Sequence, residues 1–180
     1  YLGRPCYHAM PGPCETALWT VARYGEAVVD SLAQGLGNIA ARYPDTRLVL
    51  IGYSGGGTLA MLAAGRVPQV AAVVTLAANL DTGAWTDWHG YPALSGSLDP
   101  ARDTTPERLP PSLNFAAARD RKVPPHLQTT IATRSPGATF RKIADFDHRC
   151  CWARDWPDLL VQIVDWRASG TARQPASREP

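Results

Sequence analysis

One serine in this chain lies in a turn that could present it as a nucleophile. Ser54 stands in the pentapeptide Gly52-Tyr53-Ser54-Gly55-Gly56. A serine hydroxyl attacks a carbonyl carbon only when a base removes its proton and the backbone holds it in a fixed direction. A sharp turn between a strand and a helix provides that direction, and its glycines let the two elements approach closely. The pentapeptide therefore predicts covalent chemistry at Ser54, with the amide of Gly55 as a donor to the oxyanion.

The elements that such a turn requires stand on both sides of it. An apolar run over 47–51 predicts a buried strand before the turn, and small apolar residues over 58–64 predict a helix after it. Apolar residues at helical spacing over 20–43 predict an amphipathic helix before the strand. They are Val21, Val28, Leu32, Leu36, Ile39 and Tyr43.

The remainder of the chain continues the alternation of strands and helices. Further strands are expected over 70–77, 113–118 and 139–143, with helices over 124–132 and 155–166. The last helix carries Leu159, Leu160, Ile163 and Val164 on one face. This order predicts an α/β fold, a three-layer α/β/α sandwich whose mostly parallel sheet is covered on both faces.

Two segments depart from this alternation. Residues 79–111 carry several aromatics and prolines without sustained periodicity, which predicts a long loop over the sheet edge. Trp85 and Trp88 of that loop, together with Tyr53, are candidate substrate-binding residues, although aromatic side chains in a loop serve packing equally often. The composition turns to Gly, Pro, Ser and Arg near the end, so we expect one domain over 1–168 and a disordered tail over 169–180.

The turn and the residues that follow it resemble the α/β-hydrolase superfamily, whose nucleophile turn has the form GxSxG and whose triad runs Ser, then Asp or Glu, then His. The stretch Ala-Arg-Asp-Arg-Lys-Val-Pro over 118–124 is similar to that family's GxxDxxVP loop, with Ala117 where glycine is usual. Asp120 then stands in place of the acid. His148 follows the last predicted strand, where the family has its base. The resemblance implies a serine hydrolase that acts on a small-molecule acyl substrate and needs neither cofactor nor metal.

A looser resemblance extends over nearly the whole chain. Arg-Pro-Cys over 4–6, Leu-Asp-Thr over 80–82, Trp85 and Cys-Trp over 151–152 are similar to bacterial hydrolases of the same superfamily. In those proteins, the counterpart of residues 1–5 lies at the end of the fourth strand. The resemblance therefore implies that earlier strands, and the loop with the second oxyanion donor, precede this sequence.

Other interpretations of the same residues remain open at this stage. Ser54 could be a small residue in a glycine-rich turn, His148 a structural histidine, and Asp120 a loop cap. Asp81, after an earlier strand, is a rival acid. One alternative function is a dinucleotide-binding domain, although the glycine spacing does not match GxGxxG. Another is a non-catalytic binding protein that keeps the fold.

Composition excludes several classes of protein. The chain has 180 residues, of which 45% are hydrophobic and 19% charged, as expected for one globular domain. Its net charge of +2 is dispersed, which argues against a nucleic-acid partner. No run approaches the roughly 18 apolar residues of a transmembrane helix. The sequence does not indicate an oligomeric state.

The four cysteines form two groups. Cys6 and Cys14 close a short loop rich in proline, where either a disulfide or two reduced thiols would fit. A disulfide would place the protein in the periplasm or another extracytoplasmic compartment, whereas reduced thiols would fit the cytoplasm. Cys150 and Cys151 are adjacent, and we expect them not to pair because the intervening peptide strains the bond. One of them is expected to pack beneath the His148 loop.

Overall fold

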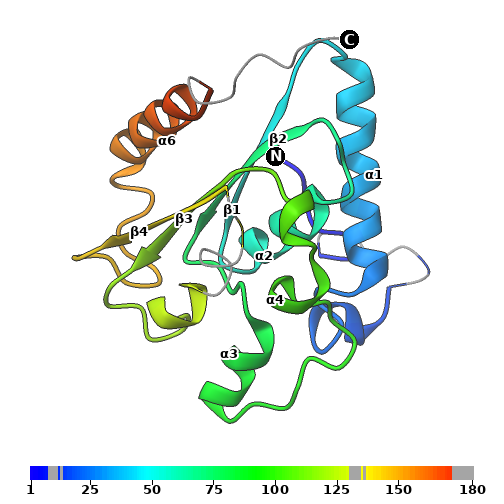
Figure 1. Cartoon of the computed structure of the whole chain (residues 1–180). Coiled ribbons are helices and arrows are strands. Elements are labelled where there is room, and N and C mark those ends of the chain that lie inside the picture. The colour runs from blue at the N-terminus through cyan, green and yellow to red at the C-terminus, as the bar shows by residue number, and fades with distance from the viewer. Residues whose placement is uncertain (8–11, 13, 130–134, 136, 172–180) are drawn as a thin grey trace.

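Four parallel strands form the centre of the molecule in the computed structural model, which describes residues 1–7, 12, 14–129, 135 and 137–171 (Figure 1). Their order across the sheet is β1-β2-β3-β4. The strands are β1 (Leu48–Tyr53), β2 (Val70–Leu76), β3 (Ser112–Ala117) and β4 (Ala138–Ile143). The four predicted strands are therefore confirmed, each within two residues at its ends.

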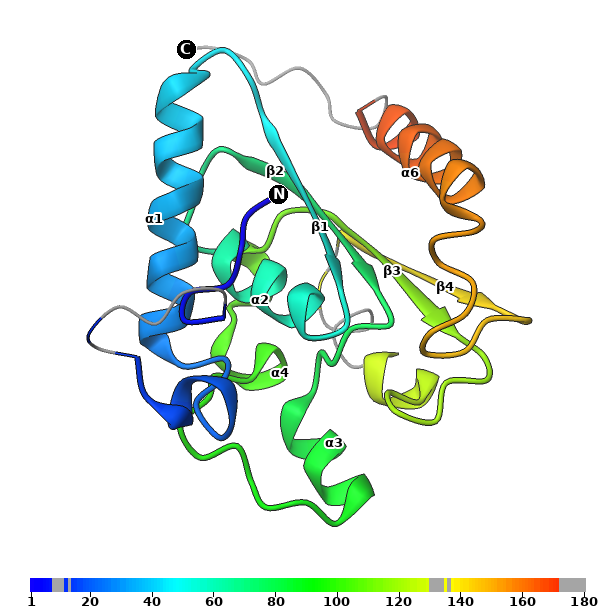
Figure 2. The same ribbon diagram turned by 180° about the vertical axis from the view of Figure 1, so that it is seen from behind.

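Helices cover both faces of this sheet (Figures 1 and 2). On one face, α1 (Glu26–Arg42) and α2 (Gly55–Ala64) share a core with Val73 of β2. On the other, α6 (Trp156–Thr171) packs against a second core that contains Val74. Neighbouring residues of a strand point to opposite faces, so β2 contributes to both cores. The predicted three-layer α/β/α architecture is confirmed.

Strand β1 is less buried than its composition suggested. It lies at one edge of the described sheet, and β2 is its partner there. The side chains of Val49, Ile51 and Tyr53 are consequently between 40% and 45% exposed. We expected a buried strand, and that expectation was wrong for the face of β1 that carries Val49, Ile51 and Tyr53.

Both long helices differ in detail from the predicted ones. Helix α1 begins at Glu26 rather than near residue 20, and a 3₁₀ turn, η1 (Thr16–Trp19), comes before it. Its buried stripe is Val28, Val29, Leu32, Leu36 and Ala40. Val21, Ile39 and Tyr43 are exposed instead. Val21 precedes the helix, and Ile39 lies about 100° around the axis from the buried Ala40, so neither faces the sheet.

Helix α6 buries a narrower face than expected. Leu159 and Ile163 are buried, whereas Leu160 and Val164 are 42% and 58% exposed. Residues four apart share a stripe, and the next residue along the chain turns away from it. The helix continues to Thr171, past the predicted domain boundary at 168, and residues 172–180 lie outside the described part.

The other predicted helix, over 124–132, is described only in part. It begins with a 3₁₀ turn, η3 (Pro125–Gln128), and Thr129 after it is helical. Residues 130–134 lie outside the described part of the chain.

The segment over 79–111 is not the structureless loop that we expected. It contains α3 (Thr82–His89), α4 (Pro100–Asp103) and a 3₁₀ turn, η2 (Pro106–Arg108). Asp81 caps the N-terminus of α3 by accepting a hydrogen bond from the amide of Ala84 at 2.9 Å. A left-handed glycine, Gly90, ends the helix. An eight-residue helix is too short to show the apolar periodicity on which the expectation relied.

One buried carboxylate ties this segment together. Asp99 is 1% exposed and accepts hydrogen bonds from the amides of Thr82, Gly83 and Ala101, at 3.0 to 3.1 Å. It therefore serves the first turns of both α3 and α4.

We expect Asp99→Ala to lower the free energy of unfolding by about 3 kcal/mol, because it leaves buried amide donors without an acceptor. Urea unfolding followed by circular dichroism measures the change. Asp87→Ala on the exposed surface of α3 is the control and should change stability by less than about 0.5 kcal/mol. Equal losses in the two variants would contradict the role assigned to Asp99.

Candidate active site

The backbone at Ser54 adopts an unusual conformation between β1 and α2. Its φ is 51° and its ψ is −126°, a region that residues other than glycine rarely occupy. The Ser54 amide donates to the carbonyl of Leu76 in β2 at 2.8 Å. The strand, the bond to β2 and the helix that starts at Gly55 together hold a conformation that would otherwise be disfavoured.

The glycines around Ser54 are required for different reasons. A Cβ at Gly52 would lie 2.4 Å from the carbonyl oxygen of Gly56, and one at Gly57 would lie 2.5 Å from the Cβ of Ala78. A Cβ at Gly56 would meet nothing within 4 Å. The close packing of helix on strand therefore depends on Gly52 and Gly57, not on Gly56 as the pentapeptide suggested.

We expect Gly57→Ala to destabilise the protein by about 2 kcal/mol, because the added methyl group overpacks the contact between α2 and the sheet. Gly56→Ala should be neutral or stabilising by up to about 1 kcal/mol, since alanine favours a helix and the position is open. Chemical unfolding of both variants provides the comparison. A Gly56→Ala variant less stable than Gly57→Ala would contradict the packing described here.

Three polar side chains meet at the carboxyl ends of the strands. Ser54 follows β1, Asp120 follows β3 and His148 follows β4. The Ser54 Oγ lies 3.1 Å from the His148 Nε2, and the His148 Nδ1 lies 2.8 Å from the Asp120 Oδ2. The side chain of Asp120 is fully buried and that of His148 is 14% exposed. With the Nδ1 proton donated to Asp120, the Nε2 is available to accept the serine proton.

The carboxylate of Asp120 is fixed by the loop in which it lies. Its Oδ1 accepts hydrogen bonds from the amides of Lys122 and Val123, each at 2.8 Å. The other oxygen is thereby directed at His148. The rival acid Asp81 instead caps α3 through Ala84.

Known structures share this arrangement of elements. The esterase domain of a Rhodothermus marinus protein aligns over 87% of this chain and 81% of its own, with a TM-score of 0.61 and 21% identity. An α/β-hydrolase enzyme from lagoon sediments at Mar Chica, Morocco, aligns over 78% and 71%, with a TM-score of 0.59 and 19% identity. Mouse α/β-hydrolase domain-containing protein 10 aligns over 78% and 70%, with a TM-score of 0.60 and 19% identity.

The chain has the α/β-hydrolase fold. No protein-family model matches the sequence, and no curated protein matches it either. The structural similarity thus identifies the fold, and the chemistry must be argued from the residues of this chain. Within the hydrolase fold, those residues lie on the loops after the parallel strands.

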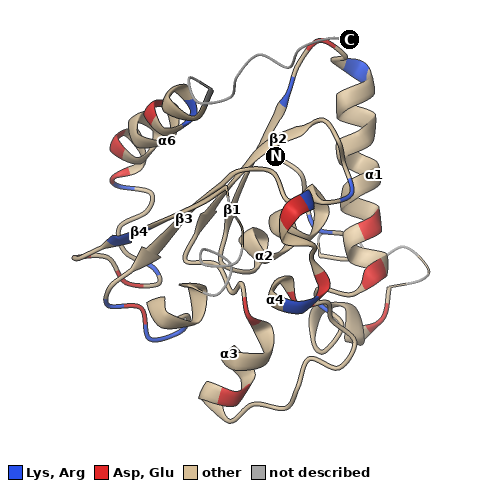
Figure 3. Ribbon diagram, in the orientation of Figure 1, with Lys and Arg blue, Asp and Glu red and all other residues tan. Residues whose placement is uncertain are grey.

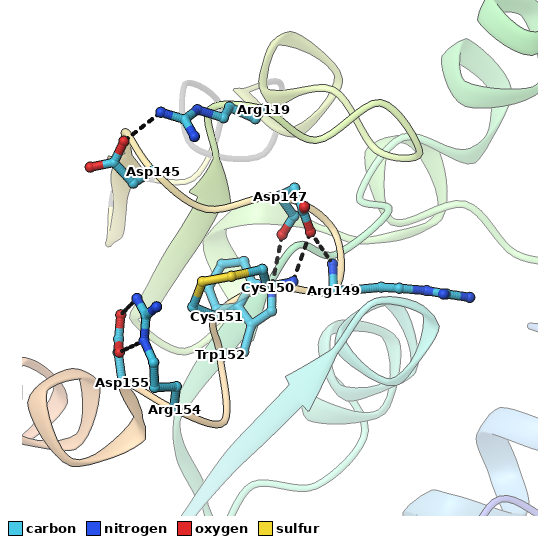
Figure 4. The surroundings of a disulfide bond; sticks show 9 residues. All are labelled: Arg119, Asp145, Asp147, Arg149, Cys150, Cys151, Trp152, Arg154 and Asp155. Atoms are coloured by element: carbon cyan, nitrogen blue, oxygen red, sulfur yellow. Dashed lines mark hydrogen bonds and ion pairs between the residues drawn. A yellow bond between two sulfur atoms is a disulfide. The ribbon is translucent and has the colours of Figure 1, made fainter.

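The loop that carries His148 is held by its own aspartate (Figure 4). The Oδ1 of Asp147 accepts hydrogen bonds from the amides of Arg149 and Cys150, each at 2.7 Å. These bonds lower the pKa of the Asp147 carboxyl, and the bond from the Cys150 amide has the larger effect. The indole of Trp152 donates to the Asp147 carbonyl at 3.1 Å. The backbone on both sides of His148 is therefore anchored.

Both cysteine pairs form disulfides in this hydrolase fold. Of the two states left open for Cys6 and Cys14, the structure has the disulfide. Cys150 and Cys151 are also bonded, so the expectation that they would not pair was wrong (Figure 4). The peptide between them is cis, and their Cα atoms lie 3.1 Å apart. Cys151 is buried in the second core, to which Trp152 also belongs.

The three predicted substrate-binding aromatics occupy different environments. The Tyr53 hydroxyl donates to the carbonyl of His148, and the two rings lie 5.4 Å apart. Partial burial, followed by the charge of Asp120, raises the pKa of the Tyr53 phenol, which favours this donor role. Trp85 lines a cavity of about 440 Å³, whereas Trp88 is 60% exposed and packs on His126.

Tyr24 is a neighbour of the site that the sequence analysis missed. It is 6% exposed, and its hydroxyl would lie 2.8 Å from a Cβ at Gly55, the residue after the nucleophile. Burial raises the pKa of the phenol, which keeps its proton. Tyr24 lies four residues before Val28, so helical spacing could have placed it in the core, but no local signal brings it to Ser54.

Neither a metal cluster nor a membrane helix is found in the described part of the chain. Among those residues, no three His, Cys, Asp or Glu side chains gather as a metal site would require. None of the described helices has both the length and the apolar character of a bilayer-spanning segment.

Proposed function

We propose that this protein is a serine hydrolase that cleaves an ester-like acyl substrate through the triad of Ser54, His148 and Asp120. The observation that supports the proposal best is the continuous chain of hydrogen bonds from the Ser54 hydroxyl through His148 to a buried carboxylate. These hydrogen bonds also argue against a pyrophosphate site at the glycines that follow Ser54. The helix α2 starts beside a nucleophile and its base, which a pyrophosphate site does not need.

In the proposed mechanism, the Ser54 oxygen attacks the acyl carbon while the His148 Nε2 takes its proton. The protonated imidazole then gives that proton to the leaving alcohol, and an acyl-serine ester remains. Water attacks this ester with His148 again as base, which releases the acid and restores Ser54. Asp120 keeps its negative charge throughout and stabilises the imidazolium.

The start of α2 provides the first stabilisation of the oxyanion. Gly55 begins that helix, so its amide has no acceptor within the helix and is the candidate donor to the oxyanion. The positive end of the helix dipole adds to this field. Losing one oxyanion donor commonly costs about 100- to 1,000-fold in turnover.

The cavity beside Trp85 is the candidate substrate pocket. Its walls include Trp85, Tyr91 and Leu94, with the basic side chains of Arg23 and Lys122 at its border. The Trp85 indole and the His89 imidazole both contact the carbonyl of Lys122, two residues after the triad acid. An aromatic wall of this kind suits an apolar acyl or alcohol group. Two of the structural neighbours are described as an esterase domain and a monoacylglycerol lipase, which also favours an ester.

The Cys6–Cys14 disulfide favours an oxidising compartment. Such bonds persist in secreted and periplasmic proteins and are rare in the cytosol of mesophiles. We therefore propose a periplasmic or other extracytoplasmic location.

A fluorophosphonate probe followed by peptide mass spectrometry tests the proposed function. We expect one stoichiometric adduct on the peptide that contains Ser54, because the probe reacts with serines activated by a base. The Ser54→Ala variant should not be labelled. Ser95→Ala, which removes an exposed hydroxyl from a loop, is the matched control and should be labelled like the parent protein. Absence of the adduct from the folded parent would favour a non-catalytic binding protein.

A further inference from the structure

A second and larger cavity lies at the opposite edge of the sheet from the triad. Its volume is about 620 Å³, and it is bounded by the residues that precede β1 and β3, by the start of β2 and by the end of α2. The triad follows the carboxyl ends of the strands, whereas this cavity adjoins their amino ends. A six-residue strand spans about 20 Å, so the two places are well separated.

Four arginines line this cavity. Arg47 precedes β1, Arg66 follows α2, Arg108 ends η2, and Arg167 lies on α6. Among the described residues, none of those that line the cavity is acidic. Elsewhere along the chain, basic and acidic residues are interspersed (Figure 3). Side chains from four separate elements thus bring positive charge to one concave surface.

Backbone contacts direct two of these arginines at the cavity wall. The Arg47 Nη2 donates to the carbonyl of Pro68 and the Arg167 Nη1 to that of Ala71, each at 3.4 Å. Both carbonyls belong to residues of the cavity wall. A guanidinium has five N–H donors in a planar fork, so a single long bond leaves Arg47 able to hold an anion as well.

Charge compensation within the cavity is incomplete. Arg66 pairs with Glu26 and Asp30 of α1, which offsets its charge. Arg47 and Arg108 form no ion pair with any carboxylate in the described part of the chain. Positive charges gathered around a concave surface create a local potential that attracts anions. The remaining wall is largely apolar, with Val67, Leu109 and Pro110 among its residues.

We propose that this cavity binds a small organic molecule that carries a phosphate or diphosphate group. A group with two or more negative charges can engage guanidinium forks from several sides, whereas one carboxylate is satisfied by a single fork. The apolar wall gives the organic part of the ligand a surface to cover. The volume lies within the range of ordinary small-molecule sites.

Isothermal titration calorimetry with ADP and with inorganic pyrophosphate tests the proposal. We expect saturable binding of ADP that weakens as salt is raised, and weaker binding of pyrophosphate, which cannot use the apolar wall. The double variant Arg47→Gln, Arg108→Gln should bind ADP about tenfold or more weakly, since charge-assisted hydrogen bonds are lost. Arg121→Gln, an exposed arginine at the triad edge, is the control and should bind as the parent does.

Thermal unfolding without ligand shows whether the double variant is folded. If it is not, each single substitution is titrated instead, with the same expectation in direction. Absence of saturable binding up to millimolar ADP would overturn the proposal. Unchanged ADP affinity in a folded variant, or pyrophosphate binding as tight as that of ADP, would do so as well.

Discussion

Ser54→Ala should reduce hydrolysis of a short-chain aryl ester by about 10⁴-fold or more, because it removes the atom that forms the acyl intermediate. The loss should appear in kcat rather than in KM, since the hydroxyl acts in the chemical step. Initial rates with a chromogenic ester measure it. The His148 Nε2 lies 3.1 Å from the Ser54 Oγ, so the base is positioned for this hydroxyl.

Stability measurements keep this result interpretable. Alanine at position 54 must adopt the same positive φ as serine does, so the strain of the turn is retained and the free energy of unfolding should change by less than about 1 kcal/mol. Ser95→Ala should hydrolyse the ester at the parental rate. A folded Ser54→Ala protein with turnover within tenfold of the parent would show the proposed mechanism to be wrong.

Asp120→Asn should lower kcat by about 10⁴-fold, the second large effect that we expect. The side-chain oxygen of an asparagine can still accept hydrogen bonds from the amides of Lys122 and Val123, so the loop should keep its shape. Its NH₂ group would then face the His148 Nδ1 and donate to it. The imidazole would have to carry its proton on Nε2, where it cannot accept the proton of Ser54.

Asp81→Asn is the matched comparison for the acid. Asparagine caps a helix about as well as aspartate, so α3 should remain intact and turnover should fall by no more than about threefold. Measuring both variants with the same ester identifies the acid. A larger loss in Asp81→Asn than in Asp120→Asn would assign the role to the other carboxylate.

The turn at Ser54 and the strands around it could be predicted because their signals are local. A continuous apolar run followed by glycines allows few conformations, and four strands were placed within two residues. Asp120 and His148 were assigned from the resemblance to the α/β-hydrolase superfamily. Both follow later strands of the parallel sheet, whose carboxyl ends share one edge.

Other features had no local signal. The helix α3 is short and is stabilised by the carboxylate of Asp99, which is sixteen residues away from Gly83 along the chain. The pairing of Cys150 with Cys151 depends on the conformation of the loop around them. Periodicity does not detect either, because each arises from a contact made after the chain has folded.

The sequence by itself determined the turn at Ser54 and the elements on both sides of it, since these depend on residue type and spacing, whereas its two partners were assigned from the family resemblance. Tertiary structure decided the rest. It placed Tyr24 against Gly55, packed the helix closely on the strand at Gly52 and Gly57, and positioned Asp81 as the N-cap of α3. Hydrogen bonds and van der Waals contacts act over a few ångströms, and only the packed sheet brings residues so distant in sequence within that range.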